Sequence, residues 1–306
     1  MGAGSIGSVV GGFLHLGGHD VYLLGKGPHI EAVAARGLEI KGIWGERNAA
    51  GIRAASSVDG MLADGFAPEW TLLSVKSYDT REALDDLAPV LGNQRGVVSL
   101  QNGLGNVEAI EGAAPGRAVG GRVIFGATTR EPGLVEVTVC ADDVLLGPAH
   151  GGPAGVEKVV EAFSDSGIPC RYEESILSYV WDKVLYNVCL NALATLLRTD
   201  YGSLGDDPGT WAVMERLTGE FYAVAEAEDV VLVSPTPAAY LSRFRDELLP
   251  PTRGHRSSMQ EDIEHGRRTE IGALNGAIAG LGRRHGVDAA ANELLTAMIG
   301  FLGSDA

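Results

Sequence analysis

Residues 1–7 read Met1-Gly2-Ala3-Gly4-Ser5-Ile6-Gly7, a G-x-G-x-x-G pattern. The residues behind it predict a helix over Ile6–Leu16 and then a strand over Asp20–Leu24. Glycines in such a loop let the backbone approach a pyrophosphate, and the helix N-terminus offers free N–H groups and a partial positive charge. We therefore expect a dinucleotide-binding loop, a glycine-rich terminal turn being the alternative. Its expected cofactor-binding residues are Gly2, Gly4, Ser5, Ile6 and Gly7.

The strand that precedes this pattern in a dinucleotide-binding fold is not present ahead of Gly2. That strand lies in the middle of the sheet, so its loss leaves two neighbouring strands without a partner. We expect that the natural start lies several residues upstream of Met1 and that this start is mis-assigned or truncated.

The strand Asp20–Leu24 is followed by Gly25-Lys26-Gly27. An NAD-binding fold places an acidic residue near this point for the ribose 2′-hydroxyl. Lys26 instead favours the 2′-phosphate of NADP, which a carboxylate would repel. A solvated loop lysine is the alternative reading of Lys26.

Two polar clusters follow predicted buried strands. Thr71–Val75 is followed by Lys76 and a helix over Arg81–Leu91, and Gly96–Leu100 is followed by Gln101-Asn102-Gly103. Open α/β sheets hold their ligands at the carboxyl ends of strands. Lys76 and Asn102 are therefore candidate ligand-binding residues, although Asn-Gly is also an ordinary turn signal.

The remaining strand signals complete an α/β half. We expect short strands over Leu38–Ile43 and Gly51–Ala54 around a polar turn, and a hairpin of Gly120–Thr129 with Leu134–Val139. After Glu174 the periodicity is almost wholly helical. The sequence thus predicts a parallel-sheet Rossmann-type domain over residues 1–174, with its first strand missing, and an all-helical domain over residues 175–306.

The helical half contains Trp181-Asp182-Lys183-Val184-Leu185-Tyr186-Asn187-Val188-Cys189-Leu190-Asn191. Lys183, Asn187 and Asn191 fall at i, i+4 and i+8, so they form one polar stripe on an otherwise apolar helix. An unpaired buried polar group costs about 1–3 kcal/mol. The stripe therefore faces a site or finds partners; a snorkelling lysine beside two structural amides is the alternative.

A second motif runs from Ser257-Ser258-Met259 to Glu270-Ile271. Either serine suits a helix N-cap with Glu261 as its capping-box partner. Glu270 is expected to begin a small apolar helix and to point into an enclosed space, where it is the carboxylate to pair with Lys183. The alternative is an exposed glutamate that favours the helix dipole.

Composition limits the partners. The chain has 306 residues, 45% of them hydrophobic, and a formal charge of −16, which argues against nucleic acid and anionic membranes. Cys140, Cys170 and Cys189 are far apart, which favours reduced thiols. No apolar run is long enough to span a bilayer, and there is no signal peptide or zinc-site pattern. We expect a metal-free cytoplasmic protein; a homodimer is left open.

With both halves considered, the chain resembles the ketopantoate reductase (2-dehydropantoate 2-reductase) family. The resemblance runs nearly end to end and is carried by the glycine loop, Val75-Lys76, Gln101-Asn102-Gly103, Lys183-x3-Asn187-x3-Asn191, and Ser257-Ser258-Met259 leading to Gly266-Arg267-x-Thr269-Glu270-Ile271. It implies a Rossmann domain, a helical domain, and NADPH with a 2-oxo acid in the cleft between them.

The resemblance also implies residue roles. By the family pattern Lys183 is the general acid that protonates the carbonyl oxygen as NADPH delivers hydride to the carbon, and Glu270 acts near that lysine and the cofactor. Asn187, Asn191 and Ser258 match substrate-holding residues. Asn102 and Lys76 match positions near the nicotinamide, with Asn102 also near the substrate. Lys26 stands where the family usually has an arginine for the 2′-phosphate.

The chain departs from this pattern in ways that leave alternatives open. His255 stands where the family commonly has an asparagine, and Lys26 gives up the bidentate phosphate contact of an arginine. A reductase of another 2-oxo acid is therefore an alternative, as is a 3-hydroxyacid dehydrogenase, which shares a Lys-x3-Asn helix. From another class, a non-catalytic NADP-binding sensor has no need of the Lys183/Glu270 pair.

Overall fold

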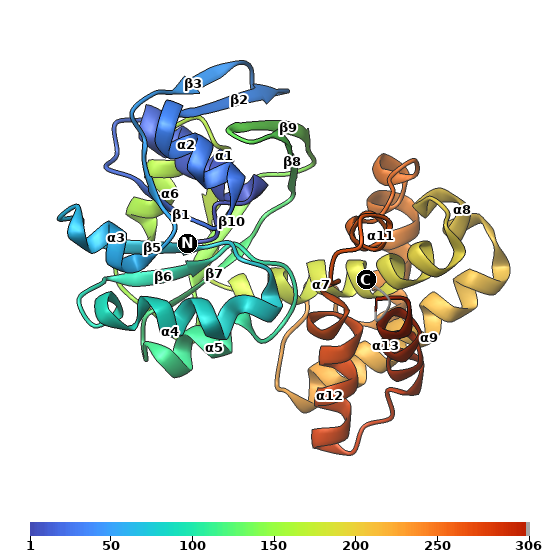
Figure 1. Cartoon of the computed structure of the whole chain (residues 1–306). Helices are drawn as coiled ribbons and strands as arrows, with labels where there is room; N and C mark the ends of the chain where they lie inside the picture. Colours follow the sequence, from blue (N-terminus) through green and yellow to red (C-terminus); the bar gives the residue numbers. More distant parts are fainter. Residues whose placement is uncertain (304–306) are drawn as a thin grey trace. The chain divides into compact units, whose positions relative to one another are not determined.

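The computed structural model describes residues 1–303 and divides the chain into two compact units (Figure 1). Unit 1 comprises residues 1–101 and 106–176. Unit 2 comprises residues 177 onwards together with the short loop 102–105. That loop leaves the sheet of unit 1 and packs with the helices of unit 2, so the division is not a single cut in the sequence.

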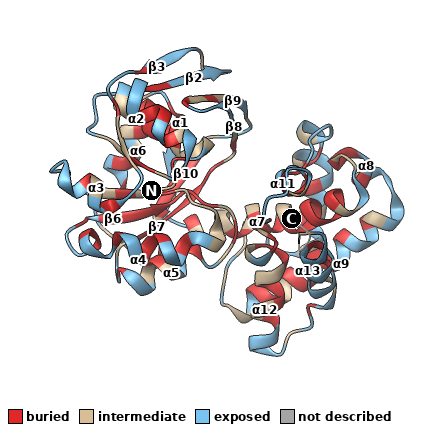
Figure 2. Ribbon diagram, viewed as in Figure 1, coloured by how far each residue is buried: buried red, intermediate tan, exposed pale blue. Residues whose placement is uncertain are grey.

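The main sheet of unit 1 has five strands in the order β11-β10-β7-β6-β5. Their bounds are β5 Trp70–Leu73, β6 Gly96–Ser99, β7 Ala118–Arg122, β10 Val144–Pro148 and β11 Cys170–Tyr172. Pairing is parallel except between β7 and β10, which run antiparallel. Every residue of β6 and β7 is buried, as expected for central strands covered on both faces (Figure 2).

Two smaller sheets complete unit 1. One is the parallel pair β1 (Tyr22–Leu24) and β4 (Arg53–Ala55). The other has the order β3-β2-β9-β8. Its strands are β2 Leu38–Gly42, β3 Arg47–Ala49, β8 Phe125–Glu131 and β9 Leu134–Cys140. No strand within residues 1–303 joins β1 to β5, which is where the sequence left the first strand missing.

Two strand predictions in unit 1 need correction. The predicted hairpin is present, since β8 pairs antiparallel with β9, but Gly120–Thr129 is not one strand, because β7 ends at Arg122 in the main sheet and β8 begins at Phe125 in the other. The predicted polar turn after Ile43 contains β3, whose Arg47 and Ala49 pair with Ile40 and Leu38. β7 is defined by its pairing with β6 and β10, which are distant in the chain, whereas β3 is defined by its pairing with the neighbouring strand β2. Periodicity records neither partner.

Six helices cover the sheets of unit 1: α1 Ser5–Leu16, α2 Pro28–Arg36, α3 Val58–Ala63, α4 Thr80–Leu91, α5 Asn106–Ala113 and α6 Val156–Asp165. A 3-10 turn, η1, covers Ser77–Asp79. The core joins both ends of this unit, since Phe13 of α1 and Phe163 of α6 belong to the same buried cluster. Burying such side chains contributes about 25 cal/mol per Å² of apolar surface.

Unit 2 is helical over its described residues. Its elements are α7 Ile176–Leu197, α8 Tyr201–Asp206, α9 Pro208–Ala227, α10 Pro237–Arg243, η2 Phe244–Leu248, η3 Pro250–Thr252, α11 Ser258–Glu264, η4 Ile271–Ala273, α12 Asn275–His285 and α13 Ala290–Leu302. Two helices of unit 2 begin at a capping residue followed by proline. Asp207 caps α9 ahead of Pro208, and Thr236 caps α10 ahead of Pro237. The second core forms around Val188, Phe221 and Phe244.

One helix prediction in unit 2 needs correction. Glu270 does not begin a helix; it precedes the short 3-10 turn η4, and α12 begins at Asn275. The interruption is at Leu274, whose φ of −108° and ψ of −105° lie outside the helical region. Within residues 1–303, no helix combines the length and the apolar character that crossing a membrane requires.

Candidate active site

The polar stripe predicted on α7 is present. Lys183 and Asn187 are half-buried and Asn191 is 5% exposed, while Val184 and Val188 between them are fully buried. Lys183 Nζ donates a hydrogen bond to Asn102 Oδ1. The ammonium is thus held by a neutral amide 81 residues away in the sequence. This contact joins two residues that sequence reasoning had placed in separate motifs.

The loop that carries Asn102 is fastened to the turn that follows Glu270. Gly103 has φ +88°, and a Cβ placed on it would lie 2.5 Å from the Cβ of Ala273, so only glycine fits this approach. Next to it, the Leu104 N–H donates to the Ala273 carbonyl at 2.8 Å. Glu270, half-buried, stands directly before this turn. The structure therefore brings the Asn102 loop, α7 and the Glu270 turn together in unit 2.

Asn191 has a partner that the sequence did not reveal. The buried Tyr201 hydroxyl donates to Asn191 Oδ1 at 2.7 Å. This fixes the amide orientation, and among residues 1–303 the Nδ2 group keeps no bond of its own. Asn187, one turn earlier, also makes no side-chain hydrogen bond to the described residues. The stripe accordingly offers amide donors one helical turn apart.

The two adjacent serines have different roles. Ser257 is buried and caps α11, its Oγ accepting from the Gln260 N–H at 3.0 Å. The same hydroxyl donates to the Asn191 carbonyl at 3.4 Å, which fastens the start of α11 to α7. Ser258 is exposed at the first position of that helix. The capping alternative thus belongs to Ser257, and Ser258 is left available for a ligand.

His255 lies close to the same groups through its backbone and its ring. Its carbonyl accepts from the Tyr201 N–H at 3.2 Å, and its imidazole meets the Tyr201 ring edge-on, with centroids 5.2 Å apart. Tyr186 also packs edge-on against Tyr201, with ring centroids 6.0 Å apart. A change at position 255 therefore alters the support of the tyrosine that orients Asn191.

An ion pair anchors the start of the stripe. Both carboxylate oxygens of Asp182 accept from Arg243 Nη2, at 2.6 and 2.5 Å, and Arg243 Nη1 donates to Ser234 Oγ at 3.0 Å. The two charged side chains are only 16% and 21% exposed, so breaking the pair would leave one charge poorly solvated. One signal for this pair is visible in the sequence, the acidic residue immediately before Lys183.

The glycine loop in unit 1 has the form expected of an anion site. A Cβ on Gly2 would lie 2.4 Å from the Val75 nitrogen, and one on Gly7 would lie 2.4 Å from the Gly2 carbonyl oxygen. These two glycines are required by packing. A Cβ on Gly4 would meet nothing within 4 Å, and its φ of −80° suits any residue. The bare backbone at Gly4 thus leaves open space at the start of α1.

The start of α1 also suits a negatively charged group. No side chain caps this end, and its first turn carries no acidic residue. The first N–H groups of a helix have no intrahelical partner, and the helix dipole adds a partial positive charge there. Together with the open space at Gly4, these features fit the pyrophosphate of a dinucleotide.

Lys26 lies in the loop after β1 and is exposed. Its Nζ donates to Glu82 Oε1 of α4 at 2.8 Å, with 71% and 64% of the two side chains exposed. This hydrogen bond raises the pKa of Lys26 and lowers the pKa of Glu82. A cofactor phosphate at this position would have to compete with Glu82 for the ammonium.

The other predicted cluster lies at the carboxyl ends of β5 and β6. Gln101 Nε2 donates to the Val75 carbonyl at 2.9 Å and to Thr80 Oγ1 at 2.7 Å, and Thr80 donates to Asn106 Oδ1 at 2.8 Å. Lys76, half-buried, stands directly before the turn η1. These hydrogen bonds were not predicted from the sequence. They fix the backbone at Val75, next to Lys76.

Comparison with known proteins shows which family the chain matches. The chain matches the family model described as ketopantoate reductase PanE/ApbA over residues 1–151 and the model of its C-terminal part over residues 175–302. The 2-dehydropantoate 2-reductase of Aquifex aeolicus (strain VF5) is 36% identical over 302 residues, which are 98% of this chain and 94% of that protein. The enzyme of the same name from Pyrococcus horikoshii is 32% identical, covering 98% and 95%.

Solved structures agree with this assignment across both units. A PanE/ApbA family ketopantoate reductase from Ralstonia eutropha JMP134 aligns with a TM-score of 0.87 and 28% identity, covering 100% of this chain and 97% of that one. A D-mandelate dehydrogenase solved with NADH aligns with a TM-score of 0.83 and 26% identity, covering 99% and 97%.

Proposed function

The chain belongs to the ketopantoate reductase family, and from that premise we propose that it reduces 2-dehydropantoate (ketopantoate) to pantoate with NADPH. The observation that carries this proposal is the hydrogen bond from Lys183 Nζ to Asn102 Oδ1, on a helix that also presents Asn187 and Asn191. A half-buried ammonium beside amide donors is suited to a substrate with a carbonyl and a carboxylate.

Lys183 supplies the proton in this proposal. When bound, NADPH supplies the hydride that the carbonyl carbon accepts. The carbonyl oxygen then takes its proton from Lys183 Nζ, which solvent reprotonates. Before that transfer the ammonium stabilises the developing alkoxide, an electrostatic contribution that is often the largest in catalysis. Asn102 acts as a positioning residue, because its Oδ1 fixes the direction of the ammonium.

The remaining residues of unit 2 hold the substrate. The amides of Asn187 and Asn191 and the exposed hydroxyl of Ser258 donate to its carboxylate and hydroxyl oxygens. Glu270, on the turn bonded to the Asn102 loop, acts near Lys183 and the cofactor by the family pattern. Each of these roles rests on the placement of the residue in the structure together with the family pattern.

Unit 1 would hold the cofactor. Gly2, Gly4 and Gly7, with the N–H groups of Ser5 and Ile6, would bind the pyrophosphate. Lys26 would bind the 2′-phosphate, and its position in the loop after β1 supports NADPH over NADH. Lys76 and Asn102 would lie toward the nicotinamide.

A second candidate is the reduction of another 2-oxo acid. It is favoured by His255, which packs on the tyrosine that orients Asn191. The similarity to a D-mandelate dehydrogenase points the same way, since that enzyme's named substrate is a different 2-hydroxy acid.

The deciding experiment follows NADPH oxidation by absorbance with ketopantoate and a panel of other 2-oxo acids. We expect the highest kcat/KM for ketopantoate. A clear preference for another acid would keep the mechanism and replace the substrate. Binding of NADPH without turnover of any acid would instead favour a non-catalytic sensor.

Variants test the assigned roles separately. Lys183→Met should lower kcat by roughly 10²–10⁴-fold, the usual contribution of an acid–base group, and leave the Kd of NADPH unchanged. Asn102→Ala should lower kcat by about 10-fold or more, since a hydrogen bond to a charged group contributes about 1.5–3 kcal/mol. Lys41→Met, at an exposed lysine of β2, is the matched control and should behave as wild type.

A further inference from the structure

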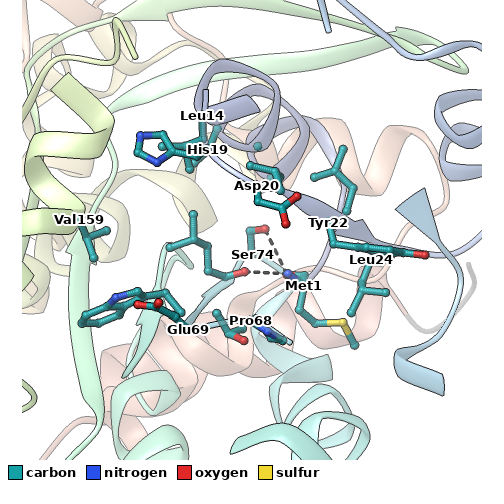
Figure 3. Close-up of a pocket in the computed structure, with 18 of the residues that line it drawn as sticks. Met1, Leu14, His19, Asp20, Tyr22, Leu24, Pro68, Glu69, Ser74 and Val159 are labelled. Carbon is teal, nitrogen blue, oxygen red and sulfur yellow. Dashed lines mark hydrogen bonds between the residues drawn. The ribbon is translucent and has the colours of Figure 1, made fainter. Parts of the chain in front are cut away.

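Two serine hydroxyls bind carbonyl groups of the glycine loop in unit 1. Ser74, which follows β5, donates to the Gly2 carbonyl at 2.9 Å, and Figure 3 shows Ser74 beside Met1. Ser8, which is fully buried in α1, donates to the Ala3 carbonyl at 3.3 Å. A loop that binds an anion through its N–H groups must keep its carbonyl oxygens turned away from that anion. A carbonyl bound to a serine of the protein is no longer free to turn toward a phosphate.

The hydrogen bond of Ser8 is unusual for a serine inside a helix. Such a serine commonly donates to the carbonyl four residues earlier. For Ser8 that carbonyl belongs to Gly4, which accepts the Ser8 N–H at 2.9 Å. The hydroxyl instead reaches Ala3, which lies ahead of the helix N-cap. Because a hydroxyl carries one proton that rotates freely, another group must direct this proton toward the loop.

That group is His29, in the first turn of α2. Its Nε2 lies 2.9 Å from Ser8 Oγ, and its Nδ1 accepts from the buried Gly133 N–H at 3.1 Å. A neutral imidazole that accepts at Nδ1 carries its proton on Nε2. His29 therefore donates to Ser8, and the Ser8 proton is left for the Ala3 carbonyl. The hydrogen bonds run in one direction, from the turn between β8 and β9 to the glycine loop.

The β8–β9 hairpin also meets the glycine loop at a second point. Thr129 Oγ1 of β8 lies 3.0 Å from the Oγ of Ser5, the first residue of α1, and Figure 1 shows α1 next to β8 and β9. Lys26, expected to bind the 2′-phosphate, precedes His29 by three residues in the chain. His29 thus connects the hairpin to the two segments of unit 1 that are expected to bind the phosphates of the cofactor.

We propose that His29 and Ser8 are positioning residues of the cofactor site. With Gly133 and Ala3 they form a hydrogen-bond relay that keeps the glycine loop in the conformation that binds a pyrophosphate. This proposal rests on the proposed binding of NADPH by that loop. Neither side chain touches the cofactor in this role, because the relay acts by restraining the Ala3 carbonyl.

The two ring nitrogens of His29 can be replaced one at a time. In His29→Gln the side-chain amide donates from nearly the position of Nε2, so Ser8 keeps its donor. In His29→Asn the shorter amide reaches only the position of Nδ1, so Ser8 loses it. By calorimetric titration we expect His29→Asn to raise the Kd of NADPH by about 3-fold to 10-fold, the contribution of one hydrogen bond, and His29→Gln to remain within about 2-fold of wild type.

A double variant tests whether the relay acts as one unit. Ser8→Ala should raise the Kd of NADPH by a similar factor, and its combination with His29→Asn should raise it no further, because both remove the same restraint. His15→Asn is the matched control. His15 also joins α1 to a distant backbone group, since its Nε2 lies 3.1 Å from the Ala50 carbonyl oxygen, but it lies at the opposite end of the helix. This control should leave the Kd of NADPH unchanged.

Two results would overturn the relay. One is a double variant in which the two losses multiply. The other is a His29→Gln variant that binds NADPH as weakly as His29→Asn, which would leave His29 a merely structural role.

Amide exchange without cofactor separates the relay from the proposed function. In the free protein, His29→Asn should speed exchange of the Ser8 amide, which donates to Gly4, and His29→Gln should not. Equal exchange rates in the two variants would count against the relay. A wild-type protein that does not bind NADPH would contradict the proposed function, and the exchange rates would still decide whether the relay restrains the loop.

Discussion

At the scale of single residues, the glycine loop separates packing from ligand binding. Gly7 has protein atoms where its Cβ would be, whereas Gly4 has open space. A side chain at Gly7 is therefore a problem for folding, and a side chain at Gly4 is a problem only for whatever approaches the loop from outside. This difference allows the two roles to be measured one at a time.

We expect Gly4→Ala to leave the unfolding midpoint almost unchanged and to weaken NADPH binding by about 10-fold or more, as steric overlap of about 1–3 kcal/mol implies. Gly7→Ala should instead destabilise the protein by about 1–3 kcal/mol. Thermal unfolding and calorimetric titration with NADPH measure the two effects. Normal NADPH affinity in Gly4→Ala would place the pyrophosphate elsewhere.

Lys26 and Glu82 give a second residue-scale prediction. If Lys26 binds the 2′-phosphate, Lys26→Ala should weaken NADPH binding by roughly 10-fold, because a charge-assisted hydrogen bond is lost, and leave NADH unaffected. Glu82→Gln should have the opposite effect and raise the preference for NADPH, since it releases the ammonium from its partner. An unchanged ratio of the two affinities in both variants would exclude Lys26 from the cofactor site.

At the scale of elements, one imidazole joins α1, α2 and the sheet that contains β8 and β9. His29 Nδ1 accepts from the Gly133 N–H at 3.1 Å, and its Nε2 lies 2.9 Å from Ser8 Oγ. An accepting Nδ1 requires the neutral ring with its proton on Nε2. Burial lowers the pKa of His29 below 6.5, against the opposing effect of the Glu131 carbonyl.

The lowered pKa of His29 makes the stability of the folded protein depend on pH. Above pH 6.5 the ring is neutral in both folded and unfolded chains. As the pH falls through 6.5, the unfolded chain takes up a proton that folded His29 resists, so stability is lost. We expect the stability difference between wild type and His29→Asn to be larger at pH 8 than at pH 5.5, as measured by urea unfolding. A difference that stays constant with pH for His29→Asn would contradict the assignment.

At the scale of the whole molecule, the two units have separate cores. Phe163 belongs to the cluster of unit 1 and Phe221 to that of unit 2, and both are fully buried. Truncating a buried phenylalanine to alanine costs about 3–5 kcal/mol. The two positions are thus matched in residue type and burial and differ only in the unit they support.

We expect Phe163→Ala to speed amide exchange in β6 and β7, and Phe221→Ala to speed it in α7 and α9. Native-state hydrogen exchange followed by mass spectrometry measures both in the same sample. Each variant is the control for the other. Equal acceleration in both units by either variant would mean that the chain unfolds as one cooperative body.

Much of this protein is determined locally and is therefore present in the sequence. The glycine loop and α1, the cap at Ser257 and the Lys183 stripe depend on residues close together in the chain, where turn chemistry, capping and periodicity act. The α/β and helical halves follow from the same signals, and the matching family confirms the fold.

Only the tertiary structure decided what depends on distant partners. The switch from β7 to β8, the pairing of Lys183 with Asn102, the orientation of Asn191 by Tyr201 and the close contact of Gly103 with Ala273 each require a neighbour fixed by packing. The helix expected to begin at Glu270 is interrupted at Leu274, although leucine has a high helix propensity. The physical reason is that sequence patterns record local preferences, whereas a site is assembled by contacts between elements that the chain brings together only when it folds.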